Sequence, residues 1–172
     1  MDLYIENLGE KEGGIFCIPL FLSNDFKDNL KNYYRQKFEK SENYAFGRLI
    51  ESDKTCGDLI EIFNFIGAVP SSAEIIINSG RMFRPLHIAM AFEKKRWRFV
   101  FHNDNYDREK DSNYSKITFL LGDEIFPELW QGGVKHETES YDTTLYDEWI
   151  VYLPVQIEDK IRAMMEEKCL NF

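Results

Sequence analysis

Short apolar runs separated by turn residues constrain the fold of this chain more than any other feature of its sequence. The runs are rich in β-branched and aromatic residues, and glycine or polar residues separate them. Pro19 lies inside the first run and lacks an amide hydrogen, so we expect that strand to be at an edge or to carry a bulge. The pattern predicts a strongly bent antiparallel sheet of five or six strands, drawn from residues 15–22, 44–50, 58–65, 86–92, 96–101 and 117–121.

Two other segments have the spacing of helices. Between residues 24 and 38, apolar side chains recur at three- and four-residue intervals, which predicts an inserted amphipathic helix near 24–38. Pro154 precedes a second segment of this kind, which predicts a C-terminal helix near 155–168. Strands and helices together predict an α+β fold.

The remaining segments give weaker signals. Residues 73–78 fit a helix or a strand equally well, whereas 103–116 and 127–144 are expected to be loops because they are polar or rich in turn residues. No repeat, low-complexity tract or linker divides the chain. We therefore expect residues 1–172 to form a single domain.

A local basic band surrounds the run at 96–101. Trp97, Phe99 and Phe101 alternate there with Arg96 and Arg98, which predicts one buried face and one mostly solvated face. Aromatic and basic residues interleaved in this way can bind single-stranded nucleic acid. We favour the alternative that the arginines cover the rim of the sheet or pair with acidic residues near the C-terminus.

The negative charge of the chain is concentrated in its last part. The formal net charge is −9, yet residues 1–100 hold 14 Lys+Arg against 14 Asp+Glu, while residues 101–172 hold 7 against 16. An acidic surface repels phosphate backbones and attracts basic partners. This distribution argues against nucleic acid as a partner, although solubility alone also explains an acidic surface.

The cysteines and the N-terminal sequence bear on location. Cys17, Cys56 and Cys169 are odd in number and far apart, which is typical of reduced thiols rather than of disulfides or a thiolate metal site. Neither a signal peptide nor a membrane-spanning run is present in the sequence. We expect a cytoplasmic protein that does not bind a membrane.

The sequence offers little support for catalysis. His87, His102 and His136 lie in separate segments without metal-ligand spacing, and the usual nucleophile and nucleotide-binding motifs are missing. We therefore expect no enzyme activity, no metal and no cofactor. One alternative stays open, namely a hydrolase or small-molecule binder whose pocket brings these histidines together with carboxylates.

Several short motifs in the first part of the chain resemble those of a known family. Residues 14–20 read GIFCIPL, residues 44–48 read YAFGR, and a strand at 59–65, an Arg84-Pro85-Leu86 segment and a tryptophan follow. This order is similar to that of the immunity protein 26 family of bacterial polymorphic toxin systems, over roughly residues 13–101. Residues 23–43 depart from it, because family members pass between the first two motifs through a short turn. The motif positions, which the resemblance implies to be structural, are Gly14, Ile18, Pro19, Leu20, Tyr44, Gly47, Arg48, Pro85 and Trp97.

The resemblance implies a cytosolic antidote with an α+β fold and no catalytic residues, whose partner is a cognate toxin domain. Nucleases are candidate toxins, because a groove that binds nucleic acid is basic and would attract an acidic surface. A regulatory or phage-borne binding module is a further possibility. From charge and aromatic content, the candidate toxin-binding residues are Tyr141, Asp142, Asp147, Glu148 and Trp149, followed by Asp104 and Asp107 in the preceding loop.

Overall fold

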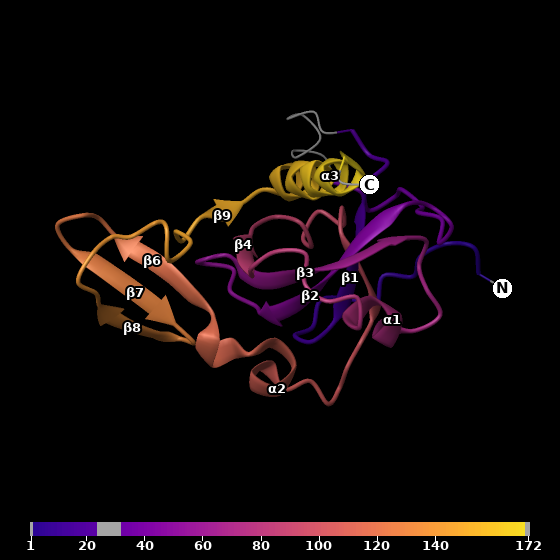
Figure 1. The fold of residues 1–172 in the computed structure, drawn as a ribbon. Helices are drawn as coiled ribbons and strands as arrows, with labels where there is room; N and C mark the ends of the chain where they lie inside the picture. Colours follow the sequence, from indigo (N-terminus) through magenta and orange to yellow (C-terminus); the bar gives the residue numbers. More distant parts are fainter. Residues whose placement is uncertain (1, 24–31, 171–172) are drawn as a thin grey trace. The chain divides into compact units, whose positions relative to one another are not determined.

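The structure is a computed structural model that describes residues 2–23 and 32–170. These residues form two compact units (Figure 1). Unit 1 comprises residues 1–104 and 151–172, and unit 2 comprises residues 105–150. That the whole chain folds as one domain stays a prediction.

A six-stranded sheet forms the centre of unit 1. Its order is β5-β1-β2-β3-β4-β9, and every neighbouring pair is antiparallel except β4 with β9. The sheet and the C-terminal helix confirm the predicted α+β class. The strands are β1 (Ile15–Pro19), β2 (Tyr44–Glu51), β3 (Asp58–Gly67), β4 (Leu86–Ile88), β5 (Arg98–Phe101) and β9 (Val151–Tyr152).

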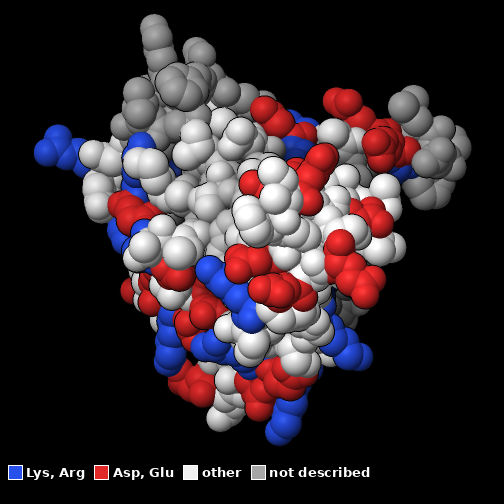
Figure 2. All heavy atoms as spheres, turned by 90° about the vertical axis from the view of Figure 1, so that its left-hand side faces the viewer, with Lys and Arg blue, Asp and Glu red and all other residues white. Residues whose placement is uncertain are grey.

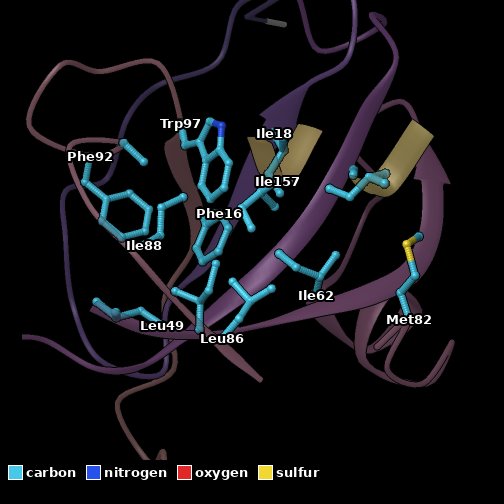
Figure 3. Close-up of a cluster of buried hydrophobic side chains, with 14 of the residues drawn as sticks. Phe16, Ile18, Leu49, Ile62, Met82, Leu86, Ile88, Phe92, Trp97 and Ile157 are labelled. Atoms are coloured by element: carbon cyan, nitrogen blue, oxygen red, sulfur yellow. The ribbon is translucent and has the colours of Figure 1, made fainter. Parts of the chain in front are cut away.

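Both faces of this sheet are buried, which explains why its strands are continuous apolar runs. On one face, Phe16 stacks on Trp97 with ring centroids 5.4 Å apart, and helix α3 (Pro154–Leu170) adds Ile157 and Ile161 (Figure 3). On the other face, Cys17 and Tyr44 belong to a second cluster that includes Ile76 of α1 (Ala73–Ile77). Figure 1 shows the two helices on opposite sides of the sheet.

The predicted C-terminal helix is present as α3, but the other predicted helix is not confirmed. Its residues 24–31 lie outside the described part of the chain, and residues 32–38 are not helical. The backbone N–H of Tyr33 donates instead to the carbonyl of Lys94, at 2.7 Å, and that of Gln36 donates to the carbonyl of Tyr33, at 3.1 Å. Tyr33 and Phe38 are both buried in the second cluster, so tertiary contacts account for the apolar spacing that had indicated a helix.

Pro19 does not mark a bulge in the described strand β1, because the extra residue at the register shift against β5 is Val100 of β5. The pairing of β1 with β5 shifts between Ile15 and Phe16 and ends at Cys17, whereas the pairing with β2 continues to Pro19. Strand β1 is therefore an interior strand whose last residues have a ladder partner on one side only. A proline is tolerated at such a position.

The arginines next to Trp97 are buried, which corrects the expectation of a mostly solvated face. Arg96 is 1% exposed and forms two hydrogen bonds to the Glu158 carboxylate of α3, at 2.8 and 2.6 Å. Glu158 is 0% exposed and also accepts the indole N–H of Trp97 at 3.0 Å. Arg96 thus pairs with an acidic residue near the C-terminus, which is one of the two roles expected for these arginines.

A second buried carboxylate lies on the opposite face. Glu61 of β3 is directly opposite Arg48 of β2 in the ladder, and its carboxylate accepts from Arg48 Nε at 2.7 Å. Arg81 pairs with the other oxygen of the same carboxylate. Two guanidinium groups therefore compensate the cost of burying this charge.

Unit 2 contains a three-stranded antiparallel sheet in the order β6-β7-β8. The strands are β6 (Thr118–Gly122), β7 (Pro127–Gln131) and β8 (Val134–Glu137), preceded by α2 (Arg108–Ser112) and a 3-10 turn at Tyr114–Lys116. The expected loop at 127–144 is thus wrong over β7 and β8, and the expected loop at 103–116 is wrong over α2 and the 3-10 turn. Gly132 and Gly133, both with positive φ, form the two-residue turn of a hairpin, so the glycine pair was the sequence signal for these strands.

We expect Glu158→Gln to destabilise the protein by about 3 kcal/mol, because it leaves the Arg96 guanidinium buried without its charged partner. Urea denaturation monitored by tryptophan fluorescence measures the change in the free energy of unfolding. Glu166→Gln on the exposed side of the same helix is the matched control and should change stability by less than about 0.5 kcal/mol. Equal effects of the two substitutions would show that the buried pair does not hold α3 on the sheet.

Candidate functional site

The candidate contact residues at 141–149 form a segment that runs along the free side of β6 in unit 2. The N–H of Leu120 donates to the carbonyl of Asp147 at 2.8 Å, and the N–H of Trp149 donates to the carbonyl of Leu120 at 2.9 Å. Leu120 and Glu148 therefore form a parallel bridge. These bonds fix the segment to the sheet and leave the Asp147 and Glu148 side chains exposed.

Trp149 packs inside unit 2 with the aromatic residues of the sheet. Its ring lies edge-on to Phe119 and to Trp130, with centroids 5.5 Å away in both cases. The side chain is half-buried. Trp149 thus anchors the 141–149 segment, and only part of its surface is available to a partner.

Tyr141 and Asp142 stabilise the same segment from its other end. The Tyr141 hydroxyl donates to Glu148 at 2.7 Å, and this bond, together with the negative charges of Glu148 and Asp123, raises the pKa of Tyr141. Asp142 accepts from the hydroxyl and the backbone N–H of Thr144, at 2.6 and 2.9 Å, which lowers the pKa of Asp142. The structure therefore brings together Tyr141 and Glu148, and it gives Asp142 a role in shaping the loop.

The two candidates from the preceding loop have local roles. Asp107 is the N-cap of α2, accepting from the backbone N–H groups of Lys110 and Glu109, and these bonds lower its pKa. Asp104 belongs to unit 1 and pairs with Lys11, which lowers the pKa of Asp104. Both carboxylates are exposed.

The excess negative charge occupies a shorter part of the chain than the comparison of residues 1–100 with 101–172 indicated. Unit 2 holds 4 Lys+Arg against 11 Asp+Glu, and residues 118–150 hold a single lysine, Lys135, against 8 Asp+Glu. On the face drawn in Figure 2, acidic side chains are nevertheless interspersed with basic ones. A contact surface must therefore be assigned from local carboxylates rather than from a uniform acidic face.

The histidines of unit 1 do not converge on a pocket. His87 is buried in β4, and His102 follows β5, where its Nε2 lies 3.0 Å from the carbonyl oxygen of Gly9. Three strands separate β4 from β5 in the sheet. His136 belongs to unit 2, where it is exposed in β8. Among the described residues, no group of three His, Cys, Asp or Glu side chains is placed to hold a metal ion.

Cys17 lies in an environment that makes its thiol unreactive. It is buried between the paired strands, and burial raises the pKa of its thiol to about 12. A thiol with that pKa stays protonated at neutral pH and is a poor nucleophile. Cys56 and Cys169 are exposed.

Sequence reasoning missed two exposed apolar residues in the turn between β6 and β7. Ile125 and Phe126 are 77% and 76% exposed, and Glu124, Glu128, Glu137 and Glu139 lie around them. The available signal was an adjacent pair of large apolar residues between Glu124 and Pro127, shortly after Gly122-Asp123.

A family model, Immunity protein 26, matches residues 11–125, which is more than half of the chain. The chain belongs to the immunity protein 26 family. The resemblance seen in the short motifs is therefore confirmed, as is the prediction of a non-catalytic protein of a polymorphic toxin system. No curated protein and no solved structure matches the chain.

Several motif residues of this immunity protein lie where unit 1 is closely packed. A Cβ atom on Gly47 would lie 2.5 Å from the Phe16 ring and 2.6 Å from the carbonyl oxygen of Glu61, and one on Gly14 would lie 2.7 Å from the Phe99 ring. The Tyr44 hydroxyl donates to the carbonyl of Glu39 at 2.7 Å. These contacts pack the sheet of unit 1. The 141–149 segment lies outside the residues that the family model matches.

No described helix has the length and apolar character needed to cross a membrane.

Stability should fall as the pH decreases from 6.5 to 4, because burial lowers the pKa of His87 from 6.5 to about 4. In this range the unfolded chain binds a proton that the folded chain does not, so the contribution of neutral His87 is complete above pH 6.5 and is lost by pH 4. The loss amounts to about 3 kcal/mol. Urea denaturation of the wild type and of His87→Asn at several pH values measures it. An identical pH dependence in both proteins would contradict this role of His87.

Proposed function

We propose that this immunity protein neutralises a cognate toxin domain by stoichiometric binding, and that unit 2 provides the contact surface. The observation that carries the proposal is the composition of residues 118–150, with one lysine against 8 Asp+Glu in a small ordered sheet. Such a surface attracts a basic protein partner. Family membership supplies the class of partner, a toxin domain.

A nuclease is the toxin that best fits this charge. An enzyme that binds nucleic acid presents clustered Lys and Arg side chains to phosphates. An acidic protein placed over that groove competes with the substrate, and it needs no reaction chemistry of its own. The site of action would be the cytoplasm, where such a toxin would meet its substrate.

Within the 141–149 segment, we assign different roles to different residues. Asp147 and Glu148 are exposed and would steer the encounter and pair with basic side chains. Tyr141 and Trp149 would hold the segment in place through the hydrogen bond to Glu148 and the ring contacts with Phe119 and Trp130. Asp142 would shape the loop, and Asp104 and Asp107 would add negative charge outside the segment.

The direct test searches the neighbouring genes for a secreted multidomain toxin and uses the C-terminal domain of that protein. Co-expression with this immunity protein should restore growth, and the two purified proteins should elute as a 1:1 complex. For a nuclease, the complex should no longer degrade DNA or RNA. Toxicity that persists at full expression of the immunity protein, with no complex formed, would overturn the proposal.

We expect the double substitution Asp147→Asn with Glu148→Gln to weaken binding of that toxin domain about tenfold at low salt, mainly through the association rate. The effect should shrink as the ionic strength rises, because salt screens exposed charges. Stopped-flow mixing at several salt concentrations measures both quantities. Glu166→Gln with Glu167→Gln on α3 removes the same charge from unit 1 and is the control. Equal effects of the two pairs would show that net charge, and not this segment, steers the encounter.

A further inference from the structure

The turn between β6 and β7 presents the most exposed large apolar side chains among the described residues. Ile125 is 77% and Phe126 is 76% exposed, whereas Trp130 and Leu129 of the adjoining strand are buried. Two neighbouring apolar side chains held in water in this way contribute nothing to the core of unit 2. Exposed apolar pairs on an ordered turn are typical of contact surfaces.

The turn is held rigidly by its own hydrogen bonds. One carboxylate oxygen of Asp123 accepts from the backbone N–H groups of Ile125 and Phe126, both at 2.8 Å. Gly122 has a φ of +76°, and a Cβ atom there would lie 2.1 Å from the carbonyl oxygen of Phe126, so only glycine fits. Gly122 also pairs with Pro127 at the end of the ladder. A turn ordered before binding loses little conformational entropy when a partner contacts it.

Carboxylates surround the apolar pair. A groove of about 410 Å³ is lined by Ile125, Phe126, Pro127, Thr138 and four glutamates, and no lysine or arginine of the described part of the chain lines it. The glutamates are Glu124, Glu128, Glu137 and Glu139. Glu128 and Glu137 are directly opposite each other in the antiparallel ladder. Like charges at such a position destabilise a sheet, and a cation from a partner would relieve the repulsion.

An electrostatic interaction links this turn to the segment to which we assign toxin binding. The negative charge of Asp123, which orders the turn, acts on Tyr141, whose hydroxyl donates to Glu148. The turn and the 141–148 segment both belong to unit 2 and both carry carboxylates.

We propose that Ile125 and Phe126 are the apolar anchor of the toxin contact, inserted in an apolar pocket whose rim carries Lys and Arg side chains that pair with the surrounding glutamates. The inference rests on the proposed function and names the residues that carry most of the affinity. Charge complementarity favours such a toxin domain over the other possible partners. Nucleic acid and anionic membranes are repelled by the glutamates, and a second copy of the chain would bring like charges together.

The test measures the affinity of the catalytically inactivated toxin domain from the neighbouring gene for variants of the turn. Phe126→Ser and Ile125→Ser should each weaken binding about 30-fold, as expected for truncation of a central anchor. Val134→Ser is the matched control, because Val134 is 65% exposed at the opposite end of the β7–β8 hairpin. Its affinity should stay within about twofold of the wild type.

Two further variants separate the anchor from the fold. Phe126→Leu keeps an apolar side chain and should retain most of the affinity that Phe126→Ser loses. Glu128→Gln with Glu137→Gln should slow association about tenfold at low salt while its melting temperature stays equal or rises, since the repulsion across the ladder is removed.

The outcomes distinguish the two proposals. If the wild type does not bind the toxin domain, the proposed function fails. If the wild type binds and the serine variants bind within about twofold of it, the anchor is overturned while the proposed function stands. If Phe126→Leu loses as much affinity as Phe126→Ser while both keep the wild-type melting temperature, an apolar anchor is likewise overturned.

Discussion

The buried Glu158 carboxylate is the interaction on which unit 1 depends. It accepts two hydrogen bonds from Arg96 and one from the Trp97 indole, so a single side chain of α3 fixes both residues that precede β5. Trp97 then stacks on Phe16 of the neighbouring strand β1. A charge can be buried here only because all of these donors are in place, which makes the position of α3 over the sheet specific rather than merely apolar.

The sequence predicted β1 to β5 because apolar runs bounded by turn residues mark them. It was wrong in placing residues 117–121 in the same sheet, since they lie in β6 of unit 2, and it did not predict the two-residue strand β9. The two faces of that sheet were harder to predict. A strand buried on both sides carries no alternation, and the arginines at 96 and 98 looked solvated because long charged side chains usually are. Their partners Glu158, Tyr33 and Gln36 are distant in sequence, so no local pattern could reveal them.

The candidate contact surface was also only partly predictable from the sequence. Negative charge and aromatic content led to Tyr141 and Glu148, which the structure does bring together. The same criterion selected Trp149, whose ring is largely used within unit 2, and Asp107, which caps a helix. Ile125 and Phe126 were passed over because apolar residues are normally taken to be buried, and exposure is a property of the fold alone.

The order of the elements along the chain affects how the protein folds during its synthesis. Strand β9 and helix α3 follow unit 2 in the sequence, yet they complete the edge and one buried face of the sheet that β1 to β5 begin. Until residues 151–170 have left the ribosome, Phe16 and Trp97 lack the cover that α3 provides. Nascent chains must therefore keep an unfinished sheet soluble while the acidic residues 105–150 are being translated, and the sheet is covered on this face only once α3 has been made.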